Sequence, residues 1–196
     1  MRFIVSSLAS LILFVVVVVV SAAEPVRGAT QDEPIKSLGT YSNVTHTHGG
    51  EDEHAVGYTV ALWQNREQLI GVFTSQYGLA DMKPCGLLTD VKYDAPRKSL
   101  KFESKLSEGS TFDKNKKQVP TRDLFEFSGT LDSTVLRGRL KQVSMLDSEA
   151  KQSNQQVKNI ELRKTNGIDA SKIDAKTFSE WKKQVGEQLK LDGPKW

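Results

Sequence analysis

The stretch from Leu100 to Leu106 reads LKFESKL, and in it apolar or small residues alternate with charged ones. Successive side chains of an extended chain point to opposite faces, so this alternation separates an apolar face from a charged face. The two sets are Leu100, Phe102, Ser104 and Leu106 on one face and Lys101, Glu103 and Lys105 on the other. One buried and one solvent-exposed face is typical of a strand in an antiparallel sheet.

The same period of two recurs on both sides of this stretch. It spans residues 56–62, 69–73, 87–93, 125–131, 135–143 and 157–163, and a weaker first strand is expected at 40–47. Short polar turns join most of these segments, and no helical period interrupts them, which argues against crossover connections. We therefore predict a mainly β protein: a single antiparallel up-and-down β-barrel of about eight strands, with a two-sheet sandwich as the alternative.

Glycines inside the predicted strands favour the barrel. They are Gly57, Gly71, Gly86, Gly129 and Gly138. Because glycine weakens a strand interior, its repetition indicates bends or places where two backbones approach closely, as in a strongly coiled sheet. Closure also removes exposed strand edges. Two polar segments, Ser107–Arg122 and Ser144–Gln156, are expected to be mouth loops or disordered excursions.

The C-terminal segment changes to a helical period. Phe178, Trp181, Val185 and Leu189 share one face of a helix, and Gly193-Pro194 would end it. Asp174 is the expected N-cap. Such an apolar stripe predicts an amphipathic helix packed against its own domain, with docking onto a partner or a membrane surface as the alternative.

The N-terminus has the pattern of an export signal. Arg2 is followed by the apolar run Leu11–Val20 and by the small residues Ser21-Ala22-Ala23. This pattern predicts cleavage before Glu24; the alternative is an uncleaved anchor, since about 20 apolar residues span a bilayer. The expected divisions are a signal peptide (1–23), a flexible leader (24–38), the barrel (39–165) and the C-terminal helix packed on it (166–196). The protein is thus expected to be exported, either periplasmic or secreted, with membrane contact only through an uncleaved signal.

Charge and cysteine content exclude some classes of partner and of stabilisation. The chain has 27 Lys and Arg against 24 Asp and Glu, a formal net charge of +3, which is too balanced to indicate nucleic acid or an anionic membrane as partner. Cys85 is the single cysteine, so an intramolecular disulfide is excluded. Its place beside Gly86 favours a small buried side chain.

The predicted meander with its trailing helix resembles the calycin group of β-barrels, and the lipocalins above all. Gly39-Thr40-Tyr41 follows the polar leader where lipocalins carry Gly-x-Trp, and Thr89-Asp90-Val91 is similar to their Thr-Asp-Tyr signature in its first two residues. The resemblance implies a barrel with a helix on its outer wall. It also implies an interior cavity, a small apolar or amphipathic ligand, and no catalysis.

In such a barrel one alternating set of side chains would line the cavity and bind the ligand. The candidates are Tyr58, Val60, Leu62, Phe73, Leu87, Val91, Phe102, Phe125 and Phe127. A filled core is the alternative, as in many small barrels, and Trp63, on the opposite alternation, is expected to close one end. The expected function is an exported non-catalytic module for a small apolar ligand or an envelope protein partner. The alternative is a structural envelope protein.

All three histidines lie between residues 46 and 54, among three carboxylates. His46-Thr47-His48 followed by Glu53 resembles the first metal motif of the cupins. The resemblance implies a divalent metal such as zinc or manganese, held by His46, His48, Glu53 and, if the loop curls back, His54. An exposed polar turn is the alternative, and otherwise no cofactor is expected. The sequence has no nucleophile elbow, phosphate loop or dinucleotide fingerprint, so we do not expect an enzyme.

Overall fold

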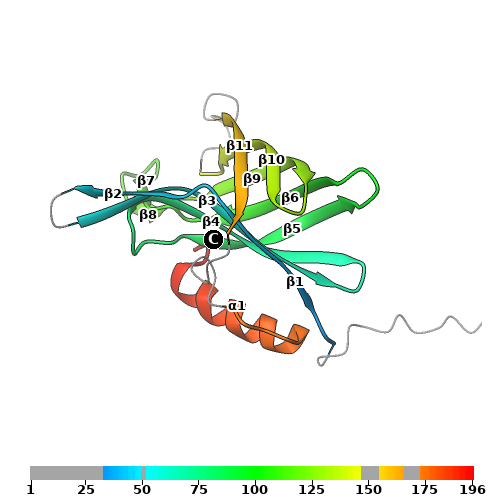
Figure 1. The fold of residues 1–196 in the computed structure, drawn as a ribbon. Helices are drawn as coiled ribbons and strands as arrows, with labels where there is room; N and C mark the ends of the chain where they lie inside the picture. Colours follow the sequence, from blue (N-terminus) through cyan, green and yellow to red (C-terminus); the bar gives the residue numbers. More distant parts are fainter. Residues whose placement is uncertain (1–32, 50–51, 147–154, 166–172) are drawn as a thin grey trace, which may run out of the picture.

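Figure 1 shows the fold in a computed structural model, which describes residues 33–49, 52–146, 155–165 and 173–196. The elements in chain order are β1 (Lys36–Ser42), β2 (Thr45–Gly49), β3 (Asp52–Asn65), β4 (Gln68–Leu79), β5 (Cys85–Asp94), β6 (Ser99–Leu106), β7 (Ser110–Phe112), β8 (Gln118–Pro120), β9 (Asp123–Leu131), β10 (Val135–Ser144), β11 (Gln155–Thr165) and α1 (Phe178–Asp192). The signal segment and most of the leader predicted from the sequence lie outside the described residues. Among the described residues, no helix has both the length and the apolar character needed to cross a bilayer.

The main sheet closes on itself. Its strands follow the order β1–β11–β10–β9–β6–β5–β4–β3–β2, and all of these neighbours pair antiparallel. β1 also pairs with β3, with Tyr41 opposite Val60, so β1, β3, β4, β5, β6, β9, β10 and β11 form a closed eight-stranded barrel. β2 continues along β3 beyond the closed part. The prediction of a mainly β, up-and-down antiparallel barrel is confirmed, and the sandwich alternative is wrong.

A packed aromatic cluster fills the middle of the barrel. The rings of Phe73 and Phe125 lie 5.1 Å apart between centroids, and those of Phe102 and Phe127 lie 4.9 Å apart. Both pairs belong to one contiguous cluster of buried side chains. Burial of such rings, at about 25 cal/mol per Å² of apolar surface, is the main contribution to the stability of a protein without a disulfide.

Two glycines that face each other across β9 and β10 make room for one of these rings. Gly129 pairs with Gly138, and a Cβ atom on Gly138 would lie 2.7 Å from the Gly129 Cα and 2.8 Å from Cζ of Phe127. The carbonyl oxygen of Ser128 would be closer still. The close backbone approach that the strand glycines predicted is therefore present at this pair.

A bulge in β5 changes which of its side chains face inward. The register with β6 shifts between Thr89 and Lys92, where Asp90 has a φ of 47°. Leu88 lies in the buried interior cluster before the bulge, and Val91 packs against the same cluster after it. Leu87, predicted to face inward with Val91, is instead 38% exposed and lies outside that cluster. The strict alternation read from the sequence was wrong at Leu87 because a bulge shifts the phase by one residue.

Helix α1 packs on the outer wall of the barrel (Figure 1), over a patch made of Ala61, Trp63, Val72 and Cys85. Trp181 and Val185 are its buried residues, and the Trp181 and Trp63 rings make an edge-to-face contact with centroids 6.0 Å apart. The predicted apolar stripe is confirmed. Trp63, however, does not close an end of the barrel: it faces outward and is covered by the helix.

The helix begins three residues later than the sequence suggested. Thr177, not Asp174, is the N-cap: the Glu180 amide donates to its hydroxyl, and the Thr177 amide donates to the Glu180 carboxylate. This capping box satisfies two amides that have no partner within the helix. The helix ends before Gly193, as predicted, and the Gly193 amide donates to the Leu189 carbonyl.

Thr177→Ala is expected to lower the free energy of unfolding by about 1 kcal/mol, because the hydroxyl that accepts from Glu180 is lost. Thr177→Ser keeps the acceptor and is expected to retain most of that stability. Urea unfolding of both variants measures the difference. Asp174→Ala serves as the control and is expected to change little; a larger loss there than at Thr177 would mean that the cap is misassigned.

The first long polar segment is partly ordered as a hairpin. β7 and β8 pair within residues 107–122, with Thr111 opposite Val119, so the expectation of a disordered excursion is wrong for this segment. Of the second segment, residues 147–154 lie outside the described residues. The hairpin positions Glu108, which precedes β7, at one mouth of the barrel.

Candidate functional site

The structure places most of the predicted cavity residues in contact with one another. Val60, Leu62, Phe73, Phe102, Phe125 and Phe127 are buried in the interior cluster, and Tyr58 and Val91 lie at its edge. Tyr58 is the member that reaches an open pocket at the end of the barrel where β7 and β8 lie: its ring stacks on Phe73 at 5.7 Å, and its other side faces this pocket. We call this end the hairpin mouth.

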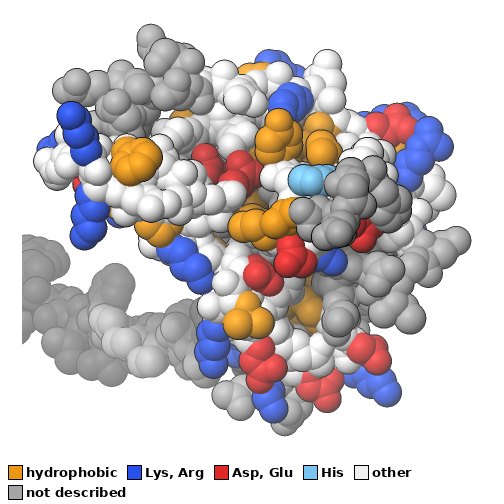
Figure 2. All heavy atoms as spheres, turned by 90° about the vertical axis from the view of Figure 1, so that its left-hand side faces the viewer, with side chains coloured by type: hydrophobic (Ala, Val, Ile, Leu, Met, Phe, Trp, Pro, Cys, Tyr) orange, Lys and Arg blue, Asp and Glu red, His pale blue; other side chains and the backbone are white. Residues whose placement is uncertain are grey.

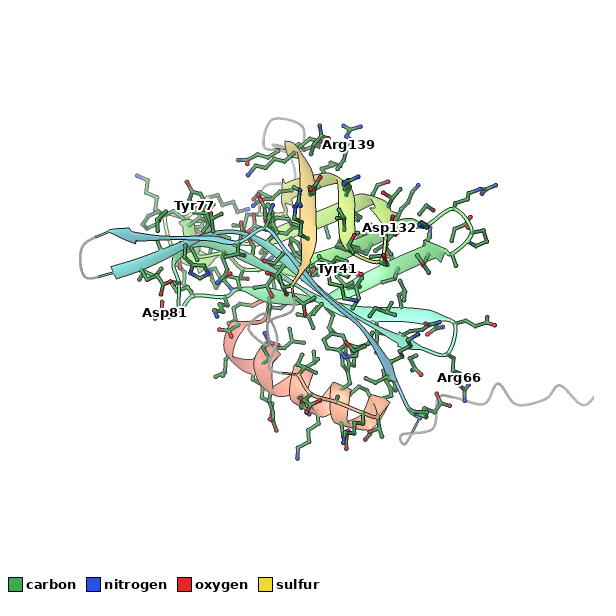
Figure 3. The ribbon with its side chains drawn as sticks, in the orientation of Figure 1. Tyr41, Arg66, Tyr77, Asp81, Asp132 and Arg139 are labelled. Carbon is green, nitrogen blue, oxygen red and sulfur yellow. The ribbon has the colours of Figure 1, made fainter. Side chains whose placement is uncertain are left out.

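The hairpin mouth holds a pocket of about 410 Å³. Its wall comes from β3, β4, β10 and β11, together with Glu108 from the segment between β6 and β7. Tyr77, at the left in Figure 3, stands at its outer edge and is 87% exposed. Figure 2 faces this end and shows hydrophobic side chains gathered beside acidic ones in the middle of the view. The exposed apolar residues of β3, β4 and the turn after it are Val56, Tyr77, Leu79 and Met82.

The inner end of the pocket is a network of polar side chains. The Ser75 hydroxyl donates to Oε1 of Glu108, and Nε2 of Gln142 donates to Oε2 of the same carboxyl at 2.7 Å. Gln142 Nε2 also makes a long contact of 3.4 Å with Oδ1 of Asp123. Asp123 is only 7% exposed, and its second oxygen, Oδ2, is buried without a hydrogen-bond partner. Asp123 does not line the pocket itself, so Ser75, Glu108 and Gln142 are the members of this network that a ligand in the pocket would meet.

Tyr58 and Lys158 form the outer rim of the same pocket. Nζ of Lys158 lies 3.3 Å from the Tyr58 hydroxyl and 5.9 Å from the centre of the Tyr58 ring. Lys158 is exposed, and its charge is thus held at the rim rather than at the inner end. The pocket therefore has an acidic inner end, an aromatic wall and a cationic edge.

A larger pocket, of about 720 Å³, lies at the opposite end of the barrel, beside the β3–β4 and β5–β6 turns. Four of its charged lining residues, Glu67, Asp90, Lys92 and Lys101, are exposed, and the fifth, Asp94, is half-buried. Solvated side chains of this kind have no unmet hydrogen bonds for a ligand to satisfy. The hairpin mouth, with buried polar groups at its inner end, is the stronger candidate although it is smaller.

The electrostatics of the hairpin mouth centre on Glu108. Burial raises the pKa of Glu108, and the nearby Asp123 carboxylate raises it further, whereas the hydrogen bonds from Ser75 and Gln142 and the Lys158 charge act in the opposite direction. An acid whose pKa is higher in the folded state binds a proton more readily when folded. Its contribution to stability is therefore full below the unfolded pKa, about 4.3, and is lost as the pH rises through the folded pKa.

Glu108→Gln is expected to remove this pH dependence. At pH 4 the variant and the natural protein should melt at similar temperatures, because Glu108 is mostly protonated in both folded and unfolded states. As the pH rises to 7, the natural protein should lose stability relative to the variant, since only it must ionise a buried carboxyl. Melting curves from pH 4 to 8 measure this.

The control is Glu126→Gln, which removes a carboxylate paired with Lys141 on the outer face. Parallel curves of melting temperature against pH for Glu108→Gln and the natural protein would contradict the expectation.

The predicted metal-binding residues are brought together only in part. Nδ1 of His46 lies 2.8 Å from Oε1 of Glu53, on the exposed ribbon of β2 and β3. In this ribbon His46 pairs with Ala55, whereas His54 pairs with Thr47, so His54 lies on the opposite face from His46 and Glu53. The His48 backbone pairs with Glu53, and its side chain lies outside the described part. No group of three or more His, Cys, Asp or Glu suited to a metal is found among the described residues. A zinc or manganese site remains a prediction.

Sequence reasoning did not identify the polar residues of the hairpin mouth. Gln142 continues the inward alternation of Leu136, Gly138 and Leu140, and Ser75 continues that of Gly71 and Phe73. A polar residue at an inward position near a strand end was the available signal. Glu108 gave no such signal, because it lies in the segment read as an excursion.

Comparison with known proteins assigns no family to this chain. No protein-family model matches it, and neither the curated proteins nor the solved structures gave a match. What the hairpin mouth can bind must therefore be judged from its own side chains.

Proposed function

We propose that this protein is a non-catalytic binding module, calycin-like in layout, that takes the polar end of a small ligand into the hairpin mouth of its barrel. The observation that carries the proposal is the Glu108 carboxyl, which lines the inner end of an open pocket and is held there by the neutral groups of Ser75 and Gln142. The aromatic interior supports a ligand held at the mouth, because the side chains expected to line a deeper cavity pack against one another.

The lining of the pocket supports an amphipathic ligand. Ser75, Gln142 and Glu108 offer hydrogen bonds at the inner end, whereas Tyr58, Val56 and Tyr77 offer apolar surface nearer to solvent. Ligand pockets commonly combine apolar walls with a few fixed polar groups. The export pattern of residues 1–23 supports a place outside the cytoplasm, where a small barrel would capture or carry such a ligand.

Benzyl alcohol is a suitable first probe, because its ring can stack on Tyr58 and its hydroxyl can reach the polar inner end. We expect it to shift the NMR signals of the Gln142 side-chain amide and of the Tyr58 ring, saturably and together. Gln156→Trp, at an exposed position that lines the pocket, should abolish these shifts by filling the mouth.

The matched control is Asn159→Trp. Asn159 is exposed on the same strand and pairs with Arg139, on the opposite alternation from Gln156 and Gln142. It should leave the shifts unchanged. If benzyl alcohol and its charged analogues leave the Gln142 and Tyr58 signals in place, the pocket does not bind a ligand of this class and the proposal fails.

A further inference from the structure

Two carboxyl groups at the inner end of the hairpin mouth have no cationic partner. Among the residues that the structure describes, no Lys, Arg or His lies within 4.0 Å of either Glu108 or Asp123 as an ion pair. The hydrogen bonds that Glu108 accepts come from the neutral groups of Ser75 and Gln142. Carboxylates that are withdrawn from water are normally paired with a cation or protonated.

The one cationic side chain that lines the pocket does not reach these carboxyls. Nζ of Lys158 contacts the Tyr58 hydroxyl at 3.3 Å and stays over the Tyr58 ring. Glu108 and Asp123 thus have no ion-pair partner within the described residues, although the Lys158 charge acts on Glu108 from the rim. A cation that entered through the mouth would meet the Glu108 carboxyl, which lines the pocket, while Asp123, which does not line it, adds negative charge close to Glu108.

We propose that the polar end of the ligand is an ammonium group, so that the hairpin mouth binds small organic amines. This inference rests on the function proposed above. An ammonium has three donors and no acceptor. The Glu108 carboxylate would accept one or two of them as charge-assisted hydrogen bonds, which are about twice as strong as neutral ones, and the nearby Asp123 charge adds to the attraction. The Tyr58 ring beside them adds a favourable surface for the cation and for the carbon atoms next to it.

The shape of the pocket favours an organic cation over a metal ion. Calcium takes six to eight oxygen ligands, and magnesium requires a close octahedral set, whereas the Glu108 carboxyl is the one carboxyl among the described residues that line this pocket of about 410 Å³. Val56 and Tyr77 supply apolar surface at the outer end, which a bare ion would not use. An anionic ligand is disfavoured by the Glu108 carboxyl and by the Asp123 charge near it, with Lys158 at the rim as the only opposing charge among the described lining residues.

Amine binding should be linked to the protonation of Glu108. Burial raises the pKa of this carboxyl, and the charged or titratable groups that face it are Asp123 from β9, Lys158 from β11 and Tyr58 from β3. A bound ammonium would stabilise the carboxylate and displace its proton. Affinity is therefore expected to fall as the pH is lowered through the acid range, while the amine itself stays protonated.

The test compares three molecules that share one ring and differ in their polar ends: benzylamine, benzyl alcohol and benzoate. Each is titrated into the protein at pH 7.5, and binding is measured by calorimetry and by NMR of Gln142 and Tyr58. We expect benzylamine to bind at least about tenfold more tightly than benzyl alcohol, as one or two charge-assisted hydrogen bonds would give, and benzoate to bind most weakly. Asp123→Asn and Glu108→Gln should bring benzylamine close to benzyl alcohol. Glu126→Gln, on the outer face of the same strand as Asp123, should leave the preference intact.

The outcomes separate this inference from the proposed function. Equal binding of all three molecules would overturn the ammonium assignment and leave the pocket as a binding site, whereas no binding by any of them would remove both. A shift of the Gln142 signal on addition of calcium or manganese, absent in Asp123→Asn, would also overturn the ammonium assignment, in favour of an inorganic cation. Retained binding of benzyl alcohol by Asp123→Asn and Glu108→Gln shows that these variants are folded.

Discussion

Gly138→Ala is expected to lower the free energy of unfolding by about 3 kcal/mol, the upper end of what overpacking a core costs. The added Cβ would lie 2.7 Å from the Cα of Gly129 on the paired strand and would press against the Ser128 carbonyl oxygen. These are backbone atoms, which cannot move without separating β9 from β10. Urea unfolding monitored by far-UV circular dichroism measures the loss.

Gly109→Ala is the matched control, because a Cβ at Gly109 would meet nothing within 4 Å. It is expected to stay within about 0.5 kcal/mol of the natural protein. Phe127→Leu combined with Gly138→Ala tests the cause. The shorter side chain removes the contact with Cζ but not the contact with the Ser128 oxygen, so only partial recovery is expected. Full recovery would mean that the ring, and not the backbone, forbids a side chain at Gly138.

The strand alternation predicted the barrel well because one face of each strand is buried and the other is solvated. In β6, Leu100, Phe102 and Leu106 are buried as the pattern indicated. The prediction failed at Leu87 because a β-bulge depends on the backbone conformation. Asp90 adopts a positive φ, and nothing in the apolar pattern marks the extra residue that the bulge leaves unpaired. The N-cap failed for a related reason, since both Asp174 and Thr177 are good capping residues and only Thr177 has a Glu three positions later.

The candidate site was less predictable than the fold, because it depends on contacts between distant segments. Ser75 and Glu108 are 33 residues apart, and Glu108 and Gln142 are 34 apart. The sequence directed attention to the histidines instead, since three of them in nine residues form a visible cluster. Barrel closure, which no local pattern encodes, brings the ends of β4, β9 and β10 together around Glu108.

Trp181→Ala is expected to expose Cys85 to thiol reagents by undocking helix α1. Cys85 is fully buried in the cluster that holds Trp181 and Trp63, and burial, followed by the nearby Asp192 carboxylate, raises the pKa of its thiol to about 12. While the helix is docked, the reactive thiolate is therefore scarce and inaccessible. Truncating a buried tryptophan costs about 3–5 kcal/mol, and a loss of about 3 kcal/mol from docking would raise the fraction of open molecules about a hundredfold.

The rate of reaction with a chromogenic disulfide reagent in native buffer measures this opening, provided that the reagent attacks more slowly than the helix closes. Circular dichroism of the β-barrel distinguishes undocking from global unfolding, because the strand signal should persist while the thiol reacts. Lys183→Ala, an exposed position on the same helix, is the matched control and should leave the rate unchanged. If Trp181→Ala reacts no faster than Lys183→Ala, the barrel wall rather than the helix protects Cys85, and the stability of the outer patch does not depend on α1.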